Sequence, residues 1–137
     1  SFLSILESIM ETRELQYLSG DKFMHMYKEK DTHRINSIYY YLMQNLSHDI
    51  LLEEVASIVN MAPTAFCRYF KSNTGKTFSK VLNELRIQHA CSLLLNPDKS
   101  ISEICYESGY NNLANFNKFF KEIVKQTPTN YRASINQ

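Results

Sequence analysis

An internal repeat constrains the fold of this 137-residue chain more than any other feature of its sequence. The segment Glu54-Val55-Ala56 corresponds to Glu103-Ile104-Cys105, which lies 49 residues later. Beyond a turn the spacing becomes 50 residues, and the segment 66–71 (FCRYFK) corresponds to 116–121 (FNKFFK). The parts keep their order, with one residue inserted in the second turn. The sequence therefore predicts that one supersecondary unit is used twice.

Each copy is predicted to consist of a helix, a tight turn and a second helix. In the second copy, Ser100 and Glu103 form a capping pattern, and Gly109 supplies the positive φ that ends a helix in a sharp turn. In the first copy, Asn60 tolerates the left-handed conformation at the turn, and Pro63 suits the first position of the next helix. Both copies are expected to bury apolar side chains: Val55, Ala56, Ile58, Val59, Phe66 and Phe70 in the first, and Ile101, Ile104, Cys105, Tyr110, Phe116, Phe119 and Phe120 in the second.

A long helix over 78–95 is predicted between the two copies. Its apolar positions recur at helical spacing: Phe78, Val81, Leu82, Leu85, Ala90 and Leu94. Asn96-Pro97 ends this helix, and Thr127-Pro128 begins a last short helix that holds Tyr131. With three Gly, three Pro and no Asn-Gly or Asp-Gly hairpin signal, the chain is predicted to be all-α. A helix of about 18 residues is roughly 27 Å long, which allows the second helices of the two units to lie about 34 Å apart.

The first 30 residues are predicted to lie outside the compact domain. One apolar stripe ends near Ser19-Gly20 and consists of Phe2, Ile5, Leu6, Ile9 and Met10. Asp31-Thr32 can cap a new helix, whose stripe consists of Ile35, Ile38, Tyr39, Leu42, Met43 and Leu46. We expect an N-terminal linker or association helix over 1–30, the tail of a missing sensory or dimerisation domain, and a domain over 31–137 that folds without it. A free amphipathic helix over 1–19 is the alternative.

The net charge of +1 does not by itself indicate a partner, but the basic residues are unevenly distributed. The stretch 68–86 has five basic side chains against Glu84, and 118–132 has four against Glu122. Such patches suit the phosphates of nucleic acid, and ordinary solvated helix faces are the alternative. The three cysteines and four histidines lack the spacing of a metal site or disulfide framework, so we expect no metal, no cofactor and a reducing cytoplasm. With no run of 18 apolar residues, no membrane contact is expected.

The repeat resembles the C-terminal DNA-binding domain of the AraC/XylS family of bacterial transcription regulators over about residues 36–132. The most specific part is an ordered set in the second half: Arg86-Ile87, Ala90, Ile101, Ile104-Cys105, Gly109-Tyr110, Phe116, Phe120, Thr127-Pro128 and Tyr131-Arg132. The resemblance implies tandem helix-turn-helix units joined by the long central helix, about seven helices in all. It also implies a cytoplasmic, nucleoid-associated regulator that reads two successive major-groove faces of a promoter. The expected partners are double-stranded DNA, RNA polymerase and a second copy bound through residues 1–19 or a missing domain.

Carried over residue by residue, the resemblance assigns base-reading positions to the outer face of one helix in each unit: Thr64, Cys67 and Arg68 in the first, and Leu113, Ala114, Asn117 and Lys118 in the second. Arg68 and Lys118 are the candidates for guanine O6 and N7, and Asn117 is the candidate for adenine. Phosphate contacts are expected from three lysines: Lys71, Lys76 and Lys121.

Several positions depart from the family pattern or allow two interpretations. Ala62 stands where the family often has serine, which removes a helix N-cap. Leu113 and Ala114 make the second reading face apolar, suited either to thymine methyl groups or to a unit that mostly grips phosphates. Cys67 is either a small filler or a redox switch. Arg86 either contacts phosphate or braces the two units.

Two other classes of function compete with DNA reading. A protein-interaction module would keep the tandem fold without base contacts, but the basic residues on the predicted outer faces favour DNA. A DNA-repair alkyl acceptor fused to such a domain would need a cysteine cluster before the repeat, and residues 1–66 contain no cysteine. The sequence therefore predicts a sequence-specific DNA-binding transcription regulator rather than an enzyme.

Overall fold

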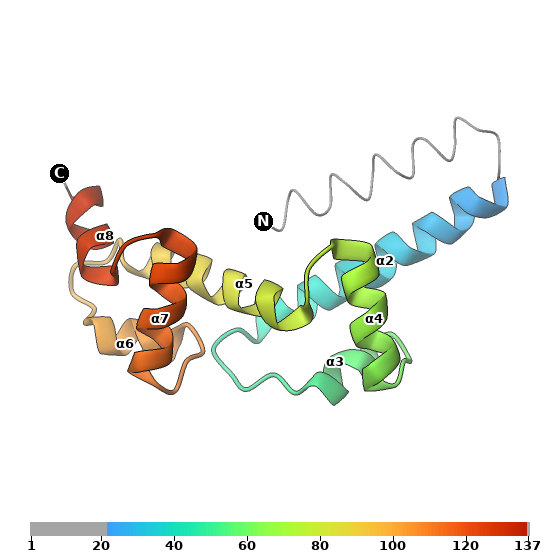
Figure 1. Cartoon of the computed structure of the whole chain (residues 1–137), viewed down its shortest axis with the longest axis horizontal. Coiled ribbons are helices and arrows are strands. Elements are labelled where there is room, and N and C mark those ends of the chain that lie inside the picture. Colours follow the sequence, from blue (N-terminus) through green and yellow to red (C-terminus); the bar gives the residue numbers. More distant parts are fainter. Residues whose placement is uncertain (1–21, 137) are drawn as a thin grey trace. The chain divides into compact units, whose positions relative to one another are not determined.

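The computed structural model describes residues 22–136, with side chains from residue 29 onward (Figure 1). This part of the chain is helical and contains no strand, which confirms the all-α prediction. Its seven helices are α2 (Lys22–Gln44), α3 (Leu52–Ile58), α4 (Pro63–Thr74), α5 (Phe78–Leu93), α6 (Ile101–Glu107), α7 (Leu113–Val124) and α8 (Pro128–Ile135). The helix predicted over 1–19 lies outside the described residues.

The helices form two compact units, which agree with the two predicted copies. Unit 1 combines the chain up to Gln44 with Ile50–Val81, and it contains α2, α3 and α4. Unit 2 combines Asn45–Asp49 with the chain from Leu82 onward, and it contains α6, α7 and α8. The boundary between the units falls within α5, the central helix, which ends two residues before the predicted position 95.

Aromatic rings fill the core of unit 1. Phe78 meets Phe66 and Phe70 edge-on, with ring centroids 5.5 and 5.6 Å apart. Tyr39 of α2 lies 6.2 Å from Phe70, so α2, α4 and the start of α5 share one core. Each of these rings is at least nine-tenths buried, and removing a buried phenylalanine from such a core costs about 3–5 kcal/mol.

Two residues expected in the core of unit 1 are exposed. Met43 keeps 52% of its surface, because it lies about 80° from the centre of its apolar stripe at 100° per residue. Ile58 keeps 37%, because it lies about 110° from the midpoint of buried Val55 and Ala56 at 100° per residue. Both assignments were therefore wrong, whereas the other members of these two stripes are buried: Ile35, Ile38, Tyr39, Leu42, Leu46, Val55, Ala56 and Val59.

Unit 2 has a core of the same kind. Tyr110 meets Phe116 edge-on at 5.6 Å, and Phe120 meets Tyr131 of α8 at 5.8 Å. Phe119, which was expected to point inward, is only half-buried and stacks on Tyr110 at 6.0 Å. The difference follows from helical spacing, since Phe116 and Phe120 are four residues apart on the inner face and Phe119 lies at its edge.

Helix α2 begins earlier than the sequence suggested. It runs without interruption from Lys22 through Asp31-Thr32, where a new helix was expected to be capped, and that expectation is wrong. Asp31 instead has its carboxylate 3.5 Å from the Arg34 guanidinium and is 4% exposed. An acidic side chain paired within a helix is not available to cap one. The division of the chain into 1–30 and 31–137 stays a prediction.

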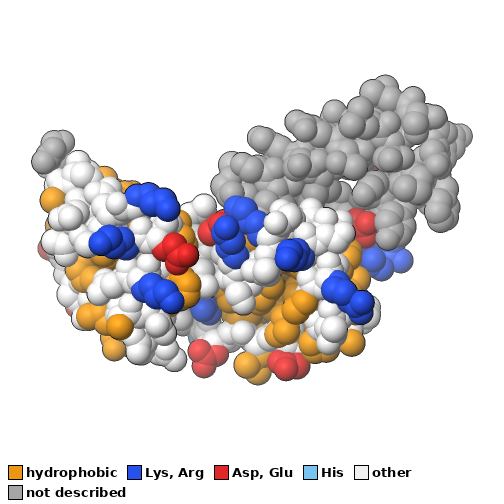
Figure 2. All heavy atoms as spheres, in the orientation of Figure 1, with side chains coloured by type: hydrophobic (Ala, Val, Ile, Leu, Met, Phe, Trp, Pro, Cys, Tyr) orange, Lys and Arg blue, Asp and Glu red, His pale blue; other side chains and the backbone are white. Residues whose placement is uncertain are grey.

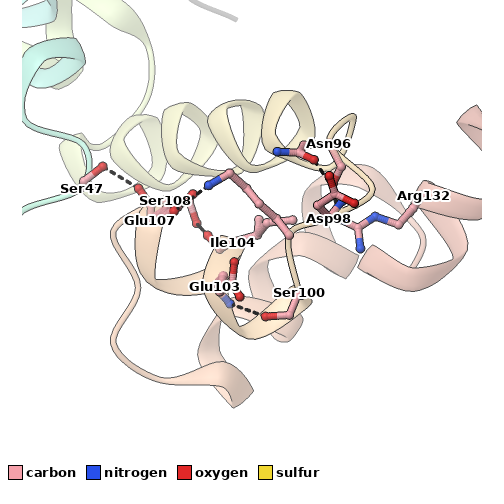
Figure 3. A network of polar contacts seen from close by, with 10 residues as sticks. Ser47, Asn96, Asp98, Ser100, Glu103, Ile104, Glu107, Ser108 and Arg132 are labelled. Carbon is pink, nitrogen blue, oxygen red and sulfur yellow. Dashed lines mark hydrogen bonds and ion pairs between the residues drawn. The ribbon is translucent and has the colours of Figure 1, made fainter.

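A network of polar contacts fixes α6 within unit 2 (Figure 3). The predicted cap is present, because the Ser100 hydroxyl accepts a hydrogen bond from the Glu103 backbone N–H at 3.1 Å. At the other end, the Lys99 ammonium pairs with the Glu107 carboxylate at 2.8 Å. The Ser47 hydroxyl donates to the Glu107 backbone carbonyl, which attaches the segment Asn45–Asp49 to α6.

Candidate nucleic-acid interface

The two helices predicted to contact DNA are equivalent in the structure. Helices α4 and α7 each have 12 residues, and each follows the turn of its helix-turn-helix unit. The inner face of α4 carries Phe66 and Phe70, and that of α7 carries Phe116 and Phe120, all with no exposed surface. With these faces anchored in the cores, the opposite faces are left to solvent.

The outer face of α4 presents the residues assigned to base reading. Thr64, Cys67 and Arg68 are exposed, and their spacing places them on one side of the helix together with exposed Lys71. Lys76 differs, because it lies beyond the end of α4 and is half-buried. Its backbone is tied to Thr74 by two hydrogen bonds, of 3.0 and 3.3 Å, so its position follows the helix end rather than the outer face.

The outer face of α7 is more apolar than that of α4. Leu113 keeps 39% of its surface, and the other assigned residues are exposed: Ala114, Asn117, Lys118 and Lys121. The Lys118 ammonium lies 5.5 Å from the centre of the Phe119 ring, a geometry in which the ring face attracts the cation. Figure 2 shows Lys and Arg side chains on the surface of each unit, taken by itself.

The turns that set these helices are strained in matching ways. The backbone has positive φ at Asn60 (57°) before α4 and at Gly109 (100°) before α7, as the sequence predicted. After the helices, Gly75 (78°) and Lys125 (71°) occupy the left-handed region at equivalent C-caps. The Cβ of Lys125 makes this conformation unfavourable, whereas Gly75 has no Cβ and adopts it without that cost. The positive φ of Lys125 was not predicted, although the repeat partner of Lys125 is Gly75.

The N-caps of the two helices differ: the predicted loss of a cap at Ala62 is confirmed, and the cap at Asn112 was not predicted. The Asn112 side chain accepts a hydrogen bond from the Asn115 backbone N–H at 2.9 Å and caps α7. Ala62 precedes α4 in the extended conformation that an N-cap requires but makes no side-chain cap bond. One of the first N–H groups of α4 therefore lacks the side-chain acceptor that α7 has.

Adding the missing cap should stabilise unit 1. We expect Ala62→Ser to raise the free energy of unfolding by about 1 kcal/mol, because the exposed residue already has the required backbone angles. Asn112→Ala is the matched control and should lower it by a similar amount. Urea unfolding followed by circular dichroism measures both. An Ala62→Ser protein that is no more stable than the parent would contradict this account of the cap.

Arg86, for which two roles were open, is engaged inside unit 2. Its guanidinium donates to the His48 backbone carbonyl at 3.1 Å and lies over the Tyr110 ring at 5.9 Å. Burial lowers the pKa of the guanidinium. The Tyr110 hydroxyl in turn donates to the Asn83 side chain at 2.6 Å. These contacts favour a bracing role for Arg86, within unit 2, over a phosphate contact.

Arg132 is a second basic residue whose charge serves the fold. It was counted in the C-terminal basic stretch, but its guanidinium donates to the Leu94 and Asn96 backbone carbonyls at 3.3 and 3.1 Å. These carbonyls follow the end of α5, where positive charge is favourable. The number of charges in this stretch does not show that Arg132 is engaged by the fold while Lys121 is exposed, because the carbonyl acceptors come close to Arg132 only in the folded unit.

The cysteines occupy different environments. Cys105 is buried, and burial raises the pKa of its thiol, in keeping with its predicted core position. Cys67 is exposed on α4. Among the side chains that the structure describes, from residue 29 to residue 136, no three or more form a group suited to a metal ion. No helix in that range is long and apolar enough to cross a membrane.

Comparison with known proteins places this arrangement in a family. A family model described as a helix-turn-helix domain matches residues 55–134. The regulatory protein PocR of Salmonella typhimurium is 36% identical over 97 residues, which are 71% of this chain and 32% of PocR. The chain thus spans about a third of the length of this curated relative.

Solved structures share the fold. A transcriptional regulator from Chromobacterium violaceum, described as an AraC-type DNA-binding domain-containing protein, superposes with a TM-score of 0.72 over 80% of this chain and 97% of that one, at 24% identity. The DNA-binding domain of AdpA, solved in complex with a target DNA, gives a TM-score of 0.67 at 25% identity, covering 74% of this chain and 90% of that one. Since the family model covers more than half of the sequence, the chain belongs to the AraC/XylS family of helix-turn-helix DNA-binding transcription regulators.

Proposed function

We propose that this domain binds double-stranded DNA with α4 and α7, each entering the major groove, and that it reads two successive groove faces of a promoter. The observation that carries the proposal is the exposed polar and basic face on each of two equivalent helices, opposite a fully buried pair of phenylalanines. An α-helix fits the major groove, where each base pair presents a distinct pattern of donors and acceptors. The spacing of about one helical turn between the two reading helices stays a prediction.

The proposed roles follow from side-chain chemistry. Arg68 on α4 and Lys118 on α7 donate to guanine O6 and N7, and Asn117 pairs with adenine. Leu113 and Ala114 contact thymine methyl groups. Lys71, Lys76 and Lys121 bind phosphates, which orient the protein without specifying sequence. Thr64 and Cys67 complete the first reading face.

The wider setting is also proposed. A DNA-bound regulator acts in the cytoplasm on the nucleoid, and regulation of a promoter involves RNA polymerase as a partner. Association into a homodimer would pass through residues 1–19 or through a domain beyond this chain. The low net charge of +1 fits a reader that relies on local basic faces rather than on a strongly positive surface.

Two substitutions test the division between reading and phosphate binding. A target is first selected from a random DNA pool with the whole chain. Arg68→Ala should then cost about 1–3 kcal/mol on that target and relax preference at one base position. Lys71→Ala, three residues away on the same exposed face, should weaken all sequences alike and lower the slope of log affinity against log salt by about one unit. Titrations at several salt concentrations measure both effects.

Identical effects of the two substitutions would contradict the assigned roles. If the chain binds the selected and random sequences equally, the domain does not read bases. The tandem fold would then be better explained as a protein-interaction module.

A further inference from the structure

Tyr69 links the proposed reading helix of unit 1 to a different helix. It lies on α4 next to Arg68, but it is half-buried whereas Arg68 is exposed. Its hydroxyl donates to two oxygens of Asp31 on α2, the backbone carbonyl at 3.3 Å and the carboxylate Oδ1 at 3.4 Å. The hydrogen bonds therefore join α4 to the N-terminal half of α2.

Asp31 is a costly residue to place at this contact, which argues that the contact has a role. It is 4% exposed, and the same Oδ1 that accepts from Tyr69 lies 3.5 Å from the Arg34 guanidinium. A buried carboxylate is tolerated only when it is paired and hydrogen-bonded. Burial, and secondarily the charge of Asp31, raise the pKa of Tyr69, so the phenol keeps its proton and remains a donor.

The second unit shows that folding does not need this hydroxyl. The repeat partner of Tyr69 is Phe119, 50 residues later, which has no hydroxyl. Helix α7 nevertheless has the same length as α4 and buries its two inner phenylalanines equally well. The Tyr69 hydroxyl thus adds a polar contact between α4 and α2 at Asp31, and this contact is found in unit 1 alone among the two units.

We propose that Tyr69 and Asp31 are positioning residues for base reading by α4. Their hydrogen bonds hold α4 against α2 in the register that places Arg68 against its base pair. A displacement of α2 at Asp31 consequently changes base discrimination by the first unit, while the phosphate contacts of Lys71 are retained. The inference rests on the proposed function, in which α4 reads DNA.

The test uses the whole chain and a DNA target selected from a random pool. Tyr69→Phe, Asp31→Ala and the double variant are titrated with three DNAs: the target, the target changed at the base pair that Arg68→Ala identifies, and random sequence. Each single variant should lose discrimination at that base pair by roughly three- to tenfold, the effect of one lost hydrogen bond. The double variant should lose no more than either single one, and affinity for random DNA should stay within about twofold.

Tyr41→Phe is the matched control. The Tyr41 hydroxyl donates to the Glu54 carboxylate at 2.7 Å, which is also a phenol–carboxylate bond made from α2, but its partner is on α3. This variant should leave discrimination unchanged. Tyr69→Phe is expected to fold because Phe119 occupies the equivalent position in unit 2, and Asp31→Ala, which removes the side-chain acceptor, provides a second, independent variant.

Each contrary result has a distinct meaning. If Arg68→Ala relaxes discrimination but Tyr69→Phe and Asp31→Ala only lower the melting temperature, the hydrogen bonds are structural and the positioning role is overturned. An equal loss of discrimination in Tyr41→Phe overturns it as well, because the effect is then not specific to α4. If Arg68→Ala changes discrimination at no base pair, the proposed function of α4 fails, and the positioning role fails with it.

Discussion

Replacing Gly109 with alanine should destabilise the second unit by roughly 2–5 kcal/mol, enough to unfold a large fraction of a marginally stable domain. Two independent costs add at this position. The backbone φ of 100° is unfavourable for any residue with a Cβ. The added Cβ would also overlap the Leu46 backbone carbonyl and lie 2.6 Å from the Arg86 Nε. Thermal or urea unfolding of the whole chain measures the loss.

Gly75→Ala separates these two costs. Gly75 also has a positive φ, of 78°, but a Cβ added there has nothing within 4 Å. Its substitution should therefore cost only the conformational term, about 1 kcal/mol. If both variants lose the same stability, the close approach of Gly109 to Leu46 and Arg86 contributes nothing, and our description of this turn is wrong.

The conformation of the Gly109 turn could be predicted from the sequence, but its contacts with the rest of unit 2 could not. The repeat and the glycine predicted a sharp turn with positive φ, because that requirement depends on local backbone geometry alone. The same is true of Asn60, of the Ser100 cap and of Pro63 at the first position of α4, all of which the structure confirms. The carbonyl of Leu46 against Gly109 was not predictable, because the two residues are distant in sequence and meet only in the folded unit.

The residues whose roles were missed or left open have partners far away in the sequence. The hydrogen bonds of Tyr69 to Asp31, of Arg86 to His48 and of Arg132 to Leu94 each join residues 38 positions apart. Composition assigned the two arginines to basic stretches, but the fold supplies backbone carbonyls that engage both of them. Helical periodicity likewise gave no reason to extend α2 through Asp31, because a buried aspartate is favourable only with partners that the sequence does not identify.

The exposed faces of α4 and α7 are the part of the candidate site whose residues could be predicted from the sequence. Their residues follow from the inward phenylalanines, since positions one and two residues beyond Phe66 and Phe116 must face away from the core. Seven assigned base-reading residues are exposed in the structure, which is a requirement for their role but does not test it. The role itself depends on DNA, and their assignment to particular bases stays a prediction.

Substituting Arg68 and Lys118 together should cause the largest loss of DNA affinity. Each side chain, if it reads guanine, contributes about 1–3 kcal/mol of discrimination. They belong to different units and share no partner, so their effects should add to about 2–6 kcal/mol on the selected target. Affinity for random DNA should fall far less, by the electrostatic contribution of two side chains. Competition titrations with target and random DNA measure both quantities.

Lys71→Ala with Lys121→Ala is the matched control, because both residues are exposed lysines on the same two helices. This pair should weaken target and random DNA by the same factor and lower the salt slope by about two units. If Lys118→Ala behaves like Lys121→Ala, unit 2 grips phosphates without reading guanine, as the apolar residues Leu113 and Ala114 would permit. If the effects of Arg68→Ala and Lys118→Ala fall well short of additive, the two units do not contribute independently to reading. Independent reading by the two units therefore makes two requirements. The effects of Arg68→Ala and Lys118→Ala must be fully additive, and the effect of Lys118→Ala must be confined to one base pair in the second half of the target.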